Sequence, residues 1–113
     1  MSDCLFCKII AGEIPSDRVY EDDQVLAFRD INPQAPVHIL IIPKEHIESI
    51  AQITPANSGV LSHIGEVIAQ IAREQKLEDG FRVCTNVGTH GCQSVKHLHF
   101  HLLAGRQLSE RLG

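Results

Sequence analysis

Residues 97–102, His-Leu-His-Phe-His-Leu, alternate an imidazole with a large apolar side chain. Successive side chains of a β-strand point to opposite faces, so this alternation predicts a strand whose two faces differ in chemistry. Leu98, Phe100 and Leu102 would face a hydrophobic core, and the three histidines would form a row on the opposite face. The chain must therefore build a sheet that packs against a core on one side and presents imidazoles on the other.

Apolar residues at three- and four-residue spacing predict a long helix between Thr54 and Gly80. Its stripe consists of Val60, Leu61, Ile64, Val67, Ile68 and Ile71. Thr54-Pro55 is typical of a helix start, with Thr as the N-cap and Pro at the first helical position. A shorter helix is predicted over residues 4–13, where apolar residues precede Gly12, a plausible helix stop.

Five short segments are predicted to be strands: residues 19–20, 25–28, 37–42, 81–87 and 94–103. The first two flank a polar turn and form a hairpin, and the third is apolar enough to be buried on both faces. Consecutive strands with short connections are usually antiparallel. The predicted class is therefore α+β, a five-stranded antiparallel sheet with the long helix on one face and a short N-terminal helix. The length of 113 residues leaves room for one core, so residues 1–113 are predicted to form one domain.

The charge balance disfavours two classes of partner. The net charge is −4 at pH 7 and no run of Lys or Arg occurs, so neither nucleic acid nor an anionic membrane is expected as a partner. No apolar stretch reaches the roughly 20 residues that span a bilayer, and the N-terminus lacks a signal pattern. We predict a cytoplasmic protein with a small ligand, whose four cysteines serve metal binding, redox chemistry or burial rather than disulfides.

A row of histidines fits two catalytic classes. In the first, His99 is a nucleophile and its neighbours handle protons and charge; in the second, two histidines bind a catalytic zinc ion that activates water. A solvated polar strand face is the simpler alternative, but three same-face histidines are hard to explain as surface filling. The preceding loop favours a phosphoryl substrate, because backbone N–H groups around Gly88, Gly91 and Ser94 could cradle phosphate oxygens.

Residues 91–106, Gly-Cys-Gln-Ser-Val-Lys-His-Leu-His-Phe-His-Leu-Leu-Ala-Gly-Arg, resemble the signature of the histidine-triad family. The similarity extends to residues 8–10, 14–15, 28–36 and 42–47, and so covers nearly the whole chain. The Gln-Ser-Val run before the triad is similar to the branch of nucleotide-binding proteins that hydrolyse purine nucleoside phosphoramidates, rather than to the dinucleoside polyphosphate hydrolases. The resemblance therefore implies a hydrolase that cleaves the P–N bond of a purine nucleoside 5′-phosphoramidate.

The resemblance also implies a role for each catalytic residue. His99 corresponds to the nucleophile that attacks the α-phosphorus and forms a nucleotidyl-histidine, which water then hydrolyses. His101 matches a position that contacts phosphate, Ser94 matches a position near the leaving amine, and His97 completes the triad. This chemistry requires no metal, because a neutral imidazole is the nucleophile and a protonated neighbour can coexist with it near neutrality.

The nucleotide-binding positions follow from the same resemblance. Asp30 would hold the ribose hydroxyls, although taken alone it is typical of a turn. Asn86 matches a phosphate-side ligand, and Gln93 and Cys92 lie in the phosphate loop, where many relatives have glycine in place of Cys92. Five residues that could equally belong to a core would form an apolar clamp around the base: Phe6, Ile9, Ile14, Phe28 and Ile31.

Three more histidines lie outside the triad and the metal motif. His38 falls inside the buried strand, so it is predicted to be a structural histidine with hydrogen-bond partners. His63, beside the helical stripe, and His90, in the loop, are assigned no catalytic role.

Cys4 and Cys7 have the two-residue spacing with which two thiolates grip one ion, and a redox pair has the same spacing. A thioredoxin-like pair normally follows a strand, whereas this pair stands near the N-terminus. The family resemblance supplies two further ligands, His46 and the first triad histidine, His97. A closed tetrahedral site of this kind leaves no open position for water, so the implied zinc is structural.

The resemblance further implies a symmetric homodimer in which two sheets join and bury apolar surface that so small a chain cannot cover alone. Three other functions stay open. They are a non-catalytic nucleotide-binding or regulatory module, a hydrolase that uses the triad to hold catalytic zinc, and a dinucleoside polyphosphate hydrolase of the same family.

Overall fold

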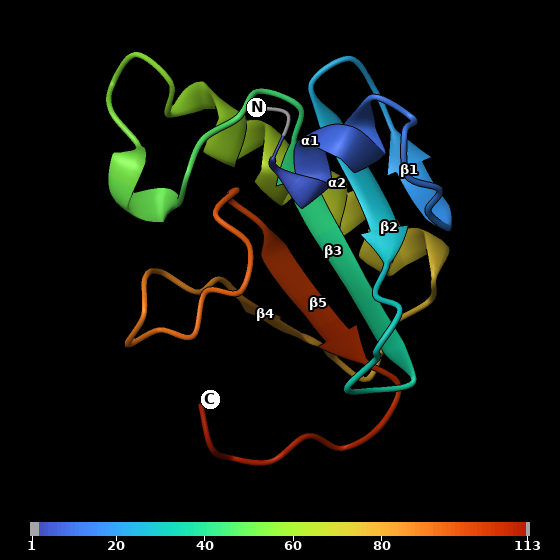
Figure 1. Cartoon of the computed structure of the whole chain (residues 1–113). Coiled ribbons are helices and arrows are strands. Elements are labelled where there is room, and N and C mark those ends of the chain that lie inside the picture. Colours follow the sequence, from blue (N-terminus) through green and yellow to red (C-terminus); the bar gives the residue numbers. More distant parts are fainter. Residues whose placement is uncertain (1–2, 113) are drawn as a thin grey trace.

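Strand β3 (Val37–Pro43) is the middle strand of a five-stranded antiparallel sheet with the order β1-β2-β3-β5-β4. Figure 1 shows the computed structural model, which describes residues 3–112. The other elements are α1 (Leu5–Ile10), β1 (Arg18–Glu21), β2 (Val25–Arg29), the short 3₁₀ helix η1 (Ile50–Gln52), α2 (Gly59–Glu74), β4 (Arg82–Cys84) and β5 (Phe100–Ala104). The predicted α+β class is confirmed.

The middle of the sheet packs against a helix on each face, with α1 in front and α2 behind in Figure 1. The α2 side buries one cluster: Val25, Ala27, Ile39, Ile41, Ile64, Val67, Ile68, Ile71 and Leu102. The α1 side buries a second cluster: Phe6, Ile9, Leu26, Phe28, Leu40 and Ile42. Alternate residues of β3 thus enter opposite cores, which explains its nearly continuous apolar sequence. Among residues 3–112, no helix combines the length and the apolar character needed to cross a membrane.

Helix α2 begins at Gly59, later than the predicted start at Thr54-Pro55. The Thr54 N–H donates to Asn57 Oδ1 at 2.6 Å, and the Ala56 N–H donates to Thr54 Oγ1 at 3.2 Å. The second of these bonds is the N-cap contact predicted for Thr54, because Ala56 lies two residues after the cap. Residues 55–58 form a separate capped turn, and the Val60 and Leu61 N–H groups then bond three residues back, to Asn57 O and Ser58 O. The regular helix therefore starts only at Gly59.

The strand predicted over residues 94–103 begins only at Phe100. The His97 N–H donates to Val95 O at 2.9 Å, and the Leu98 N–H donates to Ile47 O at 2.6 Å. The first bond turns the chain, and the second ties it to the segment after β3. Neither bond belongs to the ladders that β5 forms with its neighbouring strands. Because β5 starts at Phe100, the prediction that all three histidines lie along one strand face is wrong.

Strand β4 is likewise shorter than the predicted 81–87. Two side chains after it bond to nearby carbonyl groups: Thr85 Oγ1 donates to His99 O at 2.6 Å, and Asn86 Nδ2 donates to Gly91 O at 2.7 Å. The Thr85 side chain thus ties the end of β4 to His99, and the Asn86 side chain ties it to the following loop.

Asp22, in the turn between β1 and β2, holds the hairpin against α2. Its Oδ1 accepts the N–H groups of Gln24 and Val25 at 2.8 Å. Its Oδ2 accepts the Tyr20 hydroxyl at 2.8 Å and His63 Nε2 at 2.6 Å. Partial burial pushes the pKa of Asp22 upward, but these hydrogen bonds outweigh it and hold the pKa well below its usual range. The hydrogen bond to Asp22 raises the pKa of His63.

This pair predicts a pH-dependent contribution to stability. A raised His63 pKa means that the stabilisation is fully present below the unfolded value of about 6.5 and is lost as the pH rises through the folded value. The lowered pKa of Asp22 keeps its carboxylate charged over this range. We expect His63→Gln to lower the melting temperature clearly at pH 6 and much less at pH 9. His90→Gln, at an exposed loop position, is the control. An equal deficit at both pH values would contradict the assignment.

Candidate functional site

His99 is a buried imidazole whose tautomer is set by the main chain. Its Nδ1 lies 2.7 Å from the carbonyl oxygen of His97. A carbonyl oxygen only accepts, so Nδ1 carries the proton and Nε2 keeps its lone pair. Burial lowers the pKa of His99, and the hydrogen bond to His97 O and the charge of Asp30 offset this only in part. At pH 7 the neutral ring therefore offers Nε2 as a nucleophile.

A chain of hydrogen bonds sets the tautomer of His101. The Gln34 N–H donates to His38 Nδ1 at 3.0 Å, so neutral His38 carries its proton on Nε2. His38 Nε2 lies 2.9 Å from His101 Nδ1 and therefore donates to it. His101 then carries its own proton on Nε2. Burial, together with His99 and His38, lowers the pKa of His101 to about 4, so this ring is also neutral at pH 7.

His38 thus belongs to the site, although the sequence predicted only a structural histidine. His38 does have hydrogen-bond partners, as predicted. One of them is the triad histidine His101, whose ring centre is 5.2 Å from that of His38. The register between β3 and β5 pairs His38 with Leu103 and Leu40 with His101, which puts the two histidines diagonally opposite on one sheet face. A signal was present in the sequence, because His38 is the one polar residue of the segment 37–42.

Asp30 lies at the edge of this group. Its Oδ2 is 3.5 Å from His38 Nε2, and its Oδ1 accepts the Asn32 N–H at 2.8 Å, so it is also the turn residue that its position suggested. Asp30, His38 and His101 have the spacing of a three-ligand metal group. The hydrogen bond from Gln34 argues against an ion there, because it keeps a proton on the His38 nitrogen that would have to bind the ion.

Two side-chain amides hold the predicted phosphate loop. Asn86 Nδ2 donates to Gly91 O at 2.7 Å. Gln93 Oε1 accepts the Gly88 N–H at 3.0 Å, and Gln93 Nε2 donates to Glu48 O at 2.7 Å. The structure thus uses both amides to shape the loop and to attach it to the segment after β3.

The backbone of the predicted phosphate loop restricts the residue type at positions 91 and 92. A Cβ at Gly91 would lie 2.4 Å from Val87 O, so the chain passes too close for any other residue. The next residue, Cys92, has φ +62°, in the left-handed region that favours glycine. Its thiol is exposed. The cysteine that departs from the family pattern therefore occupies a strained position at the rim of the loop.

Four of the five predicted clamp residues lie in the apolar cluster on the α1 side: Phe6, Ile9, Ile14 and Phe28. The Phe6 ring centre is 5.0 Å from that of His99 and 5.6 Å from that of Phe28, both edge-on. Ile31 stands apart, because it is 92% exposed on the loop after β2. Ser94 is exposed as well. The structure thus brings Phe6 to His99 and leaves Ile31 outside the cluster.

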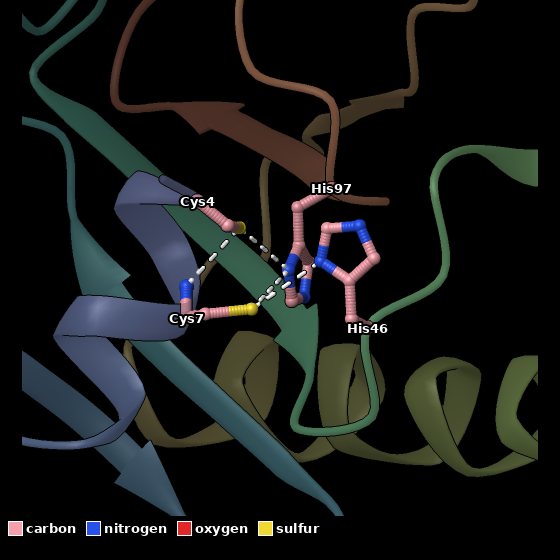
Figure 2. Close-up of side chains that lie close together, drawn as sticks. All are labelled: Cys4, Cys7, His46 and His97. Atoms are coloured by element: carbon pink, nitrogen blue, oxygen red, sulfur yellow. Dashed lines mark hydrogen bonds between the residues drawn. The ribbon is translucent and has the colours of Figure 1, made fainter. Parts of the chain in front are cut away.

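Four predicted metal ligands converge beside α1, as Figure 2 shows. Their ligand atoms all lie within 4.8 Å of one another. His97 Nδ1 is 3.3 Å from Cys4 Sγ and 3.6 Å from Cys7 Sγ, and His46 Nδ1 is 3.3 Å from Cys7 Sγ. Burial, followed by the hydrogen bond and charge of Cys4, raises the pKa of the Cys7 thiol to about 11.

The hydrogen bonds of His97 prepare it as a ligand. Its ring is fully buried, and its Nε2 lies 2.8 Å from Pro43 O, which can only accept. The lone pair is therefore on Nδ1, the nitrogen that faces the two sulfur atoms. Histidines that bind metals characteristically donate their other N–H to such a partner. Two thiols and two imidazoles form a donor set that fits tetrahedral zinc.

Two hollows of similar size lie on the surface. A groove of about 610 Å³ is lined by two predicted metal ligands, Cys4 and His46, and by Ser94, the residue predicted to lie near the leaving amine. The groove gives solvent access to the predicted metal site and to Ser94. The other hollow, of about 690 Å³, lies between the end of α2, β4 and the C-terminal segment, and no predicted site residue lines it. Its Arg82 and Arg106 donate to main-chain carbonyl groups.

Comparisons with known proteins find relatives that match nearly the whole chain. The model of a protein family described as "Scavenger mRNA decapping enzyme C-term binding" matches residues 3–112. The 14 kDa zinc-binding protein of Zea mays is 52% identical over 110 residues, which cover 96% of this chain and 86% of the maize protein. The purine nucleoside phosphoramidase of Escherichia coli K12 is 49% identical over 109 residues, which cover 96% and 92% of the two chains.

A solved structure extends the likeness to three dimensions. A histidine triad protein from Clostridium difficile superposes with a TM-score of 0.95 at 53% sequence identity. The match covers 98% of this chain and 97% of the other. Together with the triad and its hydrogen bonds, these similarities show that the chain belongs to the histidine-triad family.

Proposed function

We propose that this histidine-triad hydrolase cleaves the P–N bond of purine nucleoside 5′-phosphoramidates through a covalent intermediate on His99. The observation that carries the proposal is the buried, neutral His99, whose Nε2 is left free because Nδ1 donates to His97 O. The similarity to a purine nucleoside phosphoramidase supports the reaction class. The Gly91 loop beside the triad supports a phosphoryl substrate.

In the first step, His99 Nε2 attacks the α-phosphorus, and the bond from phosphorus to the leaving amine breaks. The imidazole becomes positively charged, and the His97 carbonyl oxygen that accepts its Nδ1 proton stabilises this charge. The His101 Nε2–H donates to a phosphoryl oxygen of the substrate. The amine leaves with a proton delivered through the exposed hydroxyl of Ser94.

In the second step, water attacks the phosphorus of the intermediate, and the bond to His99 Nε2 breaks. A nucleoside monophosphate leaves, the second proton of the water passes to solvent, and His99 returns to its neutral form. Asp30 would hold the ribose hydroxyls, and the cluster around Phe6 and Phe28 would contact the base. Ile31, exposed on the loop after β2, would cover the free edge of that base.

The nucleophile is tested with His99→Asn, which removes the reactive nitrogen. We expect kcat/KM for an adenosine phosphoramidate to fall by at least about 10³-fold, while adenosine monophosphate still binds, because its other contacts remain. Mass spectrometry after acid quench should find a nucleotidyl adduct on the wild-type chain and none on the variant. His63→Asn, on α2, is the matched control and should keep both turnover and adduct.

Other outcomes identify the competing functions. Turnover retained by His99→Asn would overturn the nucleophile assignment. Loss of wild-type turnover after exhaustive chelation would favour a catalytic metal. Nucleotide binding without hydrolysis of any phosphoramidate would favour a binding module, and preference for a dinucleoside polyphosphate would favour the other branch of the family.

We propose zinc as the resident ion of Cys4, Cys7, His46 and His97. The similarity to a zinc-binding protein of maize and the two-sulfur, two-nitrogen donor set support this choice. With four protein ligands the ion would supply structure rather than activate water. It would tie α1 to the segments that contain His46 and His97.

Elemental analysis of protein purified without chelator should find about one zinc per chain. Cys4→Ser should lose the ion, and Cys92→Ser, whose thiol lies outside the cluster, should keep it. Zinc at about 100 times its Kd stabilises the folded state by about 2.7 kcal/mol. At about 4 °C per kcal/mol, the melting temperature of Cys4→Ser should fall by roughly 10 °C. A wild-type protein that contains no zinc and melts at the same temperature as Cys4→Ser would refute the site.

We also propose that two chains associate through β4. This strand forms one edge of the sheet, where its outer N–H and C=O groups have no strand partner among residues 3–112. Phe81, Val83 and Val87, in and beside the strand, are 42%, 39% and 37% exposed. Pairing of two such edges would extend the sheet across a two-fold axis and cover these side chains.

Light scattering should give twice the chain mass of 12.5 kDa at micromolar concentration. Val83→Asp should shift the protein to the single-chain mass, because it places a charge in the proposed interface. Ile31→Asp changes an equally apolar and more exposed residue on the loop after β2, away from β4, and should leave the dimer intact. A wild-type protein with the mass of one chain would overturn the proposal.

A further inference from the structure

We propose that metal binding at Cys4, Cys7, His46 and His97 and nucleotide binding at His99 are thermodynamically coupled, with His97 and Phe6 as the coupling residues. The inference rests on the proposed function, because it assumes that zinc and a nucleotide are the two ligands. It goes beyond that function, in which the ion has no effect on the nucleotide.

His97 is the first link, because its side chain faces the metal ligands and its main chain contacts His99. Its side-chain Nδ1 faces the sulfur atoms of Cys4 and Cys7. Its main-chain oxygen accepts the proton of His99 Nδ1 at 2.7 Å, the bond that sets the tautomer of the nucleophile. The residue is fully buried, so a shift of its ring toward or away from a metal must move its main chain as well.

Phe6 is the second link. It stands between the two cysteines in the sequence Cys4-Leu5-Phe6-Cys7, on the six-residue helix α1. Its ring meets His97 and His99 edge-on, with ring centres 5.9 Å and 5.0 Å apart. The ring that contacts the nucleophile is therefore placed by the same helix turn that holds both thiols.

Helix α1 and the His46 segment depend on these contacts for their positions. A helix of one and a half turns has little stability of its own, so α1 is held by packing and by whatever binds its cysteines. Ile47, next to His46, accepts the Leu98 N–H at 2.6 Å, one residue from His99. An ion bound to all four ligands would therefore join the three segments that surround His99.

The expected consequence is positive coupling. Zinc would restrict Phe6 and His97 to the arrangement that binds nucleotide, so the nucleotide would meet a site that is already ordered. Coupling between binding sites is reciprocal, so each ligand must tighten the other by the same factor. Factors of about 5 to 150 are usual for coupled sites, and we expect a factor of about ten here.

The test measures both halves of this linkage with adenosine monophosphate, which undergoes no turnover. Calorimetry should give an adenosine monophosphate Kd about ten times lower for zinc-loaded than for chelator-stripped wild-type protein. Competition with a chromogenic chelator should show the zinc Kd lowered by the same factor when adenosine monophosphate is present. Chelator, zinc and nucleotide without protein provide the correction for direct binding of zinc to the phosphate.

Phe6→Leu separates coupling from simple retention of metal. This variant keeps all four ligands and should still bind one zinc per chain, but the coupling factor should fall toward one. Ile10→Val, on the same helix and against the same cluster, is the matched control and should keep the wild-type factor.

Each failure has a distinct signature. Equal adenosine monophosphate affinity with and without zinc would overturn the coupling and leave the proposed function intact. A full coupling factor in Phe6→Leu would overturn the role of α1. Absence of nucleotide binding in both forms would overturn the proposed function, and the coupling with it.

Discussion

The fully buried ring of His97 is the constraint on which the site depends. A buried imidazole must satisfy both nitrogens, and His97 does so with Pro43 O on one side and the sulfur atoms of Cys4 and Cys7 on the other. Meeting these partners turns the chain before β5, so that His97 leaves the row that alternation alone would make. The same turn presents its carbonyl oxygen to His99 Nδ1. One residue thus belongs to the proposed metal group through its side chain and sets the tautomer of His99 through its main chain.

Main-chain groups also decide the protonation pattern of the other histidines. Burial lowers the pKa values of His38, His99 and His101, which keeps these neighbouring rings neutral. A neutral ring has one donor and one acceptor nitrogen, so a single contact to a carbonyl or amide group determines both. The His97 carbonyl oxygen and the Gln34 N–H supply these contacts. The result is a free lone pair on His99 and a donor on His101, the two properties that phosphoryl chemistry requires.

Much of the architecture could be predicted because it follows from local periodicity. The apolar stripe of α2 indicates a helix with one buried face, and the continuous apolar run of β3 indicates a strand with two buried faces. Predictions of element ends were weaker, since hydrogen bonds outside the regular helix and sheet pattern decide them. Thr54 caps a separate turn ahead of α2 rather than α2 itself, and the main-chain bonds of His97 and Leu98 replace the first half of a strand. The family resemblance brought together the four metal ligands, but it did not include His38 in the site.

By itself, the sequence determined the doubly buried strand β3, the apolar stripe of α2 and the paired thiols, because a continuous apolar run, helical spacing and a short motif are local patterns. Only the tertiary structure decided which histidine serves which group. The partners Cys4 and His97 are 93 residues apart, and His38 and His101 are 63 apart. Strand register and the turn at His97 bring them together, and neither is encoded in the spacing of the histidines. Distant partners then set the tautomers of His97 and His101, through Pro43 O and His38. The tautomers of His99 and His38 are set by the nearby His97 O and Gln34 N–H.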